Sequence, residues 1–219
     1  MLANTLVWLS EYAGGNTQAL FLSHGFVPAH ASIATAFTSM FLHAGFWHLA
    51  GNMFFFWMFA NRVENLFGSW LFAAAYLLSG FGATAFYFAL NRYSSIPLVG
   101  ASGAISGIAG CFLVLFPSAE FDLIFYIGYI RLGRLETLAW AAVLAWFGEQ
   151  TLLALTTMAF HTAGGVAYWA HFGGFLVGLV IGFLFRVVAT EKVLQAEKDL
   201  DAEESTNRRR LRESSEYTD

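Results

Sequence analysis

Charged side chains are scarce in this sequence and unevenly placed. They make up 12% of its 219 residues, whereas about a quarter of a typical soluble domain is charged. Fifteen of the 26 follow Thr190, and no lysine precedes Lys192. So few basic residues ahead of the tail exclude a nucleic-acid-binding surface, and we expect no nucleic-acid partner. The single cysteine, Cys111, excludes an internal disulfide.

Long apolar runs take the place of the missing charges. Hydrophobic residues make up 58% of the chain, and a helix needs about 20 of them to cross the roughly 30 Å hydrocarbon core of a bilayer. Five runs meet this length: residues 41–60, 66–90, 98–117, 137–160 and 163–185. The sequence therefore predicts an all-α, polytopic transmembrane helix bundle whose surroundings are a lipid bilayer.

The N-terminal region does not fit a complete span. Residues 1–9 are apolar but would cover only about 13 Å as a helix, so they are either the remnant of a first span or a short interfacial piece. Residues 19–40 contain Pro28 and several polar side chains, which favours an interfacial loop with short helices over a re-entrant span. We expect three parts: this region at 1–40, a membrane core at 41–190, and a charged tail at 191–219 that begins as a helix and frays into disorder.

Basic residues predict the orientation of the spans. One set of span ends carries five of them, and the other set carries only Arg92: the five are Arg62, Arg131, Arg134, Arg186 and Lys192. The positive-inside rule places the richer set, together with the C-terminal tail, in the cytoplasm. The spans at 41–60, 98–117 and 163–185 then all begin near the outer surface of a cell (inner) membrane.

Polar side chains gather near these three outer ends. Counted along each helix, Ser102 lies about 6 Å from its outer end, His48 about 10 Å and Asn52 about 16 Å. His171 lies about 6–12 Å from the start of the last span. Polar groups inside a bilayer are costly and mark candidate functional sites. One hydroxyl, two imidazoles and one carboxamide can therefore meet at a similar depth.

Such a set of groups suits peptide-bond hydrolysis. Ser102 can act as the nucleophile and His171 as its base, while His48 and Asn52 share a helix face and can donate to an oxyanion. Helix packing glycines would let the spans approach closely: Gly103, Gly107, Gly174 and Gly178. The only Asp before the tail is Asp122, in a loop, and the core has no lysine and no H-E-x-x-H zinc motif. A serine–histidine dyad is the arrangement that remains.

These motifs resemble those of the rhomboid intramembrane serine proteases over about residues 38–185. The G-A-S-G at 100–103 resembles the family's serine motif, residues 43–52 its second-helix motif, and A-H-F-G-G at 170–174 its last-helix motif. The resemblance implies a six-helix core, here with an incomplete first helix, and an enzyme without metal or other cofactor. It also implies transmembrane protein substrates cut near the outer membrane surface. The oligomeric state is left open.

Other interpretations stay open beside this one. A rhomboid-like protein with an incomplete core could be a catalytically silent binder of membrane proteins, and paired intramembrane histidines also occur in haem anchors. Ser106, one turn below Ser102, could compete as nucleophile, although packing is the simpler role. Glu149, within the fifth run, could serve gating or hydration, or be a hydrogen-bonded structural group.

Overall fold

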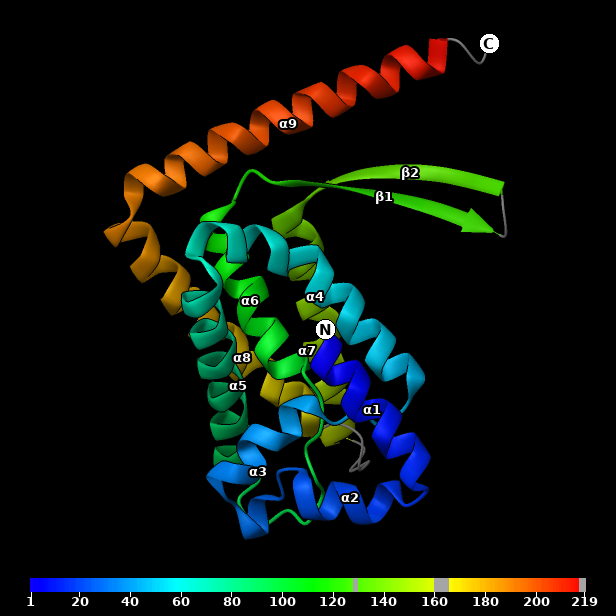
Figure 1. The fold of residues 1–219 in the computed structure, drawn as a ribbon, viewed down its shortest axis with the longest axis vertical. Coiled ribbons are helices and arrows are strands. Elements are labelled where there is room, and N and C mark those ends of the chain that lie inside the picture. The colour runs from blue at the N-terminus through cyan, green and yellow to red at the C-terminus, as the bar shows by residue number, and fades with distance from the viewer. Residues whose placement is uncertain (128–129, 160–165, 217–219) are drawn as a thin grey trace.

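A computed structural model describes residues 1–127, 130–159 and 166–216 of the chain. Five long helices form its centre (Figure 1): α4 (Phe46–Phe67), α5 (Ser69–Leu90), α6 (Ser102–Leu115), α7 (Ala139–Ala159) and α8 (Val166–Val188). Among the described residues, two stretches are long and apolar enough to cross a membrane, Ser69–Leu90 and Tyr168–Val188. The predicted all-α bundle is confirmed, and its helices fall within the five apolar runs or a few residues beyond them.

Helix α6 is the central element of the bundle. Eleven of its 14 residues are buried, since it packs against α4, α5 and α8 at once. A helix buried on all sides must be apolar around its whole circumference, and Ile108, Phe112 and Leu115 are completely buried. The predicted run at 98–117 is only partly helical because residues ahead of Ala101 are extended, with Gly100 at φ 128°.

Short helices precede the bundle: α1 (Leu2–Gly14), α2 (Thr17–His24), η1 (Pro28–His30), α3 (Ile33–Thr38) and η2 (Ser39–Phe41). Asn16 and Ser32 cap α2 and α3 by accepting backbone N–H groups, which satisfies donors that a short helix cannot pair internally. Helix α1 lies beside α4, and α2 and α3 lie at one end of the bundle (Figure 1). α1 continues past residue 9, the end of the predicted apolar piece.

A β-hairpin and a long helix occupy the opposite end of the bundle (Figure 1). Strands β1 (Glu120–Ile127) and β2 (Ile130–Leu138) pair antiparallel between α6 and α7. The sequence predicted only a loop there. Helix α9 (Thr190–Glu216) includes most of the charged tail. It is helical over all of its described length, whereas the sequence predicted that the tail frays.

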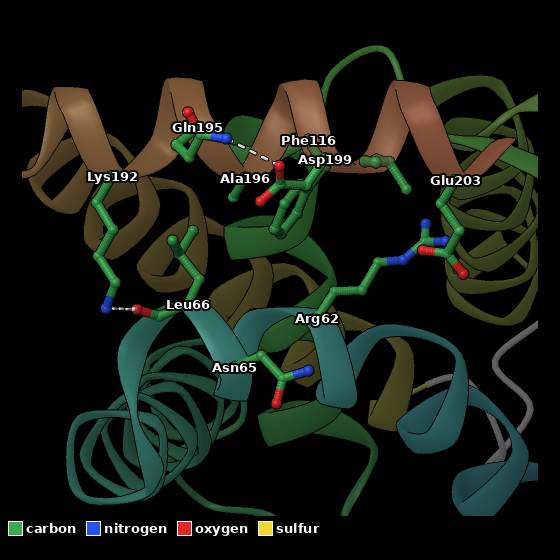
Figure 2. A pocket seen from close by; sticks show the side chains of 10 residues that line it. Arg62, Asn65, Leu66, Phe116, Lys192, Gln195, Ala196, Asp199 and Glu203 are labelled. Carbon is green, nitrogen blue, oxygen red and sulfur yellow. Dashed lines mark hydrogen bonds between the residues drawn. The ribbon is translucent and has the colours of Figure 1, made fainter. Parts of the chain in front are cut away.

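Helix α9 is fastened to the bundle near its start. Val193 and Leu200 are buried against the core, and Arg186 of α8 pairs with Glu197 at 2.8 Å. Lys192 donates to the carbonyl of Leu66 at the end of α4 (Figure 2). A cleft of about 410 Å³ separates α4 from α9 next to this contact. The tail is therefore part of the folded structure at this end.

Candidate active site

The backbone ahead of Ser102 is held in an extended path. Phe26 and Leu98 exchange two backbone hydrogen bonds of 3.0 and 2.8 Å, and Gly100 N–H donates to the carbonyl of Ser39 at 2.9 Å. Gly100 adopts φ 128°, a conformation that residues with a Cβ rarely take. These bonds to Phe26 and Ser39 thus fix the extended segment that leads into Ser102, the first residue of α6.

His171 of α8 meets Ser102 directly. Its Nε2 lies 2.7 Å from the Ser102 Oγ, within hydrogen-bond distance. Both side chains are partly buried, so neither is sealed inside the protein. The structure therefore brings together the two residues that the sequence predicted as nucleophile and base, although they lie 69 positions apart.

Glycines allow this contact between α6 and α8. A Cβ placed on Gly174 would overlap the carbonyl of Gly103, and one on Gly178 would overlap the carbonyl of Gly107. The two contacts advance along both helices together, so α6 and α8 run parallel. When two helix backbones are this close, side chains on their facing sides come within hydrogen-bond distance, as Ser102 and His171 do. We call this contact, formed by Gly103, Gly107, Gly174 and Gly178, the glycine seam.

Aromatic rings surround the imidazole of His171. The Trp146 ring of α7 lies 5.8 Å away at 34°, and the Tyr168 ring lies 6.3 Å away nearly edge-on. Packed rings restrict the rotation of a side chain between them. Helix α7 therefore helps to hold His171 in its orientation toward Ser102.

His48 lies on the other side of Ser102, and Asn52 lies one turn further along the same face of α4. A Cβ on Gly100 would lie 2.9 Å from His48 Nε2 and 3.5 Å from Ser102 Oγ, so these atoms surround the same point. His48 Nδ1 accepts the backbone N–H of Ala44 at 3.3 Å. In a neutral imidazole the proton is then on Nε2, which becomes a donor. Asn52 is buried, and its Nδ2 has no partner among the described residues.

Ser106 and His43 lie near this group, and each is close to a backbone carbonyl. Ser106 donates to the carbonyl of Ser102, one turn back on α6, at 2.7 Å, which matches the packing role rather than a competing nucleophile. His43 is buried ahead of α4, and its Nδ1 lies 3.1 Å from the Phe41 carbonyl. The side chain of Glu149 lies outside the described residues. So does His161, where the short gap between the apolar runs at 137–160 and 163–185 predicts a tight turn.

One polar residue at this end escaped the sequence analysis. Glu11 of α1 is only 4% exposed, and its carboxylate accepts the backbone N–H of His43 at 3.3 Å. The signal for it was present, because Glu11 is the only Asp, Glu, Lys or Arg in the first 61 residues. It was missed because the apolar piece at residues 1–9 ends before it.

Comparison with known proteins identifies the family. The Rhomboid domain model matches residues 30–187, which include His48, Asn52, Ser102, His171 and the glycine seam. The chain belongs to the rhomboid family. A yeast relative, "Rhomboid protein 1, mitochondrial" of Saccharomyces cerevisiae, is 32% identical over 155 residues, or 66% of this chain and 40% of that protein.

Two Arabidopsis thaliana proteins extend the comparison. "RHOMBOID-like protein 6, mitochondrial" is 35% identical over 151 residues, covering 67% of this rhomboid and 42% of the relative. "Rhomboid-like protein 11, chloroplastic" is 29% identical over 211 residues, covering 94% and 69%. This rhomboid spans about two fifths of the length of the first two relatives. Family membership makes it a membrane protein of the rhomboid type.

Proposed function

We propose that this rhomboid is a serine endopeptidase that hydrolyses peptide bonds of single-pass membrane proteins near the outer membrane surface. The observation that carries the proposal is the hydrogen bond of 2.7 Å between Ser102 Oγ and His171 Nε2. A serine hydroxyl is a weak nucleophile until a neighbouring base takes its proton. His171 is the group placed to do so.

Bond cleavage follows from this pair. Ser102 Oγ attacks the substrate carbonyl carbon while its proton passes to His171 Nε2. His171 then gives that proton to the leaving amine, and an acyl-enzyme remains on Ser102. The substrate must be locally unwound at the cut, because the carbonyls of an intact helix are engaged in its own hydrogen bonds.

Negative charge on the carbonyl oxygen needs donors in place before the reaction. His48 Nε2–H and the unpartnered Nδ2–H of Asn52 supply them from one face of α4. Donors that are fixed in a water-poor site stabilise an oxyanion far more than donors in bulk water do. A role as oxyanion donor would explain why the amide of Asn52 is buried without a partner among the described residues, an arrangement that otherwise costs stability.

Water must then hydrolyse the acyl-enzyme. A cavity of about 10 Å³ beside Ser102 is lined by Ser39, Thr84 and Gly100, among others. This volume is close to that needed for one water molecule. His171, neutral again after the first step, can activate that water in the same way as it activated Ser102.

The positions of the basic residues indicate on which side of the membrane the site opens. The basic residues Arg62, Arg186 and Lys192 lie at the end of the bundle that carries α9, and the positive-inside rule places this end in the cytoplasm. The site then opens on the outer side of a cell (inner) membrane. The chemistry drawn from Ser102 and His171 needs no metal or other cofactor.

The test is cleavage of a single-pass model substrate by the purified protein in detergent, with fluorophosphonate labelling in parallel. We expect Ser102→Ala and His171→Ala to abolish cleavage, because each removes half of the dyad. Ser106→Ala is the matched control: it deletes a hydroxyl one turn away that, among the described residues, bonds its own helix backbone, and activity should persist. Undiminished cleavage by the Ser102→Ala or His171→Ala variant would refute the dyad, and absence of labelling in the wild type would favour a silent binder.

A further inference from the structure

Glu11 is a buried acid with no role in the dyad. Its side chain is 4% exposed; Oε2 accepts the His43 backbone N–H at 3.3 Å, and Oε1 is buried without a partner among the described residues. Burying a carboxyl group is unfavourable unless its hydrogen bonds compensate. A second polar side chain of the same helix, Asn4, is also buried, at 5% exposed. The N-terminal helix is thus docked through polar groups rather than by apolar packing alone.

Glu11 hydrogen-bonds the backbone turn that also contacts the His48 ring. His43 is followed by Ala44, whose backbone N–H donates to His48 Nδ1 at 3.3 Å. The His43 and His48 rings are also in contact, with centroids 5.3 Å apart. A shift of the His43–Ala44 backbone would therefore move the one donor that fixes the His48 tautomer. Without that donor, an imidazole can carry its proton on either nitrogen.

We propose that Glu11 is a positioning residue for the oxyanion donor. Its carboxylate holds the His43–Ala44 backbone, that backbone keeps His48 Nδ1 unprotonated, and His48 Nε2–H consequently points to the space in front of Gly100 and Ser102. This inference rests on the proposed proteolytic function for its consequence in catalysis. Its structural core, the link from Glu11 to the tautomer of His48, stands independently of activity.

A pair of variants separates hydrogen bonding from packing. Glu11→Gln keeps an acceptor oxygen in nearly the same volume, whereas Glu11→Leu fills the volume and removes the acceptor. We expect Glu11→Leu to lower kcat about tenfold with KM within about twofold of the wild type, since the oxyanion donor acts mainly in the transition state. Glu11→Gln should retain at least about half of wild-type kcat. Equal losses in both variants, or none in Glu11→Leu, would overturn the proposal.

The tautomer gives a readout that does not depend on proteolysis. Nitrogen NMR of ¹⁵N-histidine-labelled Ser102→Ala protein in detergent, with His48 assigned by its loss in His48→Asn, reports which ring nitrogen is protonated. We expect a protonated Nε2 in the parent and in Glu11→Gln, and a mixture of tautomers in Glu11→Leu. A parent protein with Nδ1 of His48 protonated would refute the inference even if Glu11→Leu did not fold. Absence of cleavage in the wild type, with the expected tautomers, would instead refute only the proposed function.

Discussion

Asn52 is the residue whose chemistry can be tested most directly. Its Nδ2 is buried with no partner in the described part of the chain, so removal of the amide breaks no hydrogen bond of that nitrogen. We expect Asn52→Ala to lower kcat about 10²–10³-fold, the usual loss for one oxyanion donor. The melting temperature in detergent should stay within a few degrees of the wild type.

Asn61 provides the control on the same helix. It is exposed on α4, so Asn61→Ala makes the same chemical change away from Ser102 and should leave kcat unchanged. If Asn52→Ala cleaves substrate as fast as Asn61→Ala does, Asn52 is not an oxyanion donor, and its buried amide needs another explanation.

For individual residues, the sequence predicted which side chains of the site lie at a similar depth, but it did not predict the hydrogen bonds that hold them. Helical rise alone places Ser102, His48 and His171 at similar depths, and the structure brings them together. Rise does not give the rotation of each helix or the path of the loops. The bond from Glu11 to His43 joins residues 32 positions apart, with α2, η1, α3 and η2 between them, and no local pattern encodes such a bond.

Among the elements, the glycine seam sets the distance between α6 and α8, and so the distance between Ser102 and His171. A Cβ at Gly178 would overlap backbone atoms of Gly107, which cannot move aside as a side chain can. We expect Gly178→Ala to destabilise the protein by about 1–3 kcal/mol, the range for an overpacked core, and to reduce fluorophosphonate labelling of Ser102. Reversible unfolding in mixed micelles measures the first effect.

Gly51 is the matched control for this substitution. It lies within α4, and a Cβ there would meet nothing within 4 Å. Gly51→Ala should leave stability unchanged or raise it by up to about 1 kcal/mol, since alanine is the better helix former. Equal behaviour of the two variants would show that α6 and α8 separate without consequence for the fold.

The apolar runs predicted the five long helices because a membrane span leaves a strong signal in composition. The hairpin of β1 and β2 left no comparable signal. Its sequence is a mixture of apolar and charged residues without strict alternation, and a short apolar run does not distinguish a strand from a loop or a buried helix. The pairing of Glu120 with Leu138 closes this segment into antiparallel strands, and only the three-dimensional structure reveals it.

For the whole molecule, α9 joins the last span to the end of the bundle. Val193 is completely buried, whereas its neighbour Leu194 is 43% exposed. We expect Val193→Asp to undock α9, because the loss of a buried valine costs about 2 kcal/mol before the charge is counted. Hydrogen exchange of the α9 amides should then accelerate about tenfold or more.

Leu194→Asp introduces the same charge and the same helix propensity one position away, and it should leave exchange in α9 nearly unchanged. Similar rates in both variants would mean that the helix is not held by its buried face. The sequence did not predict this docking because Val193, Ala196 and Leu200 are only three apolar contacts along an otherwise charged helix. Such sparse spacing does not differ from that of a solvated helix.

Because α6 and α8 touch through their main chains, substitutions of the Ser102 and His171 side chains and substitutions of the seam glycines have different effects on the fold. Replacing the hydroxyl or the imidazole would remove the proposed dyad and leave the packing of the bundle intact, since neither group supports the main chains that touch. One methyl group on a glycine of the seam would weaken the helix packing and the dyad together. The dyad can therefore be lost in a single step while the architecture stays, whereas a change in this part of the architecture also disturbs the dyad.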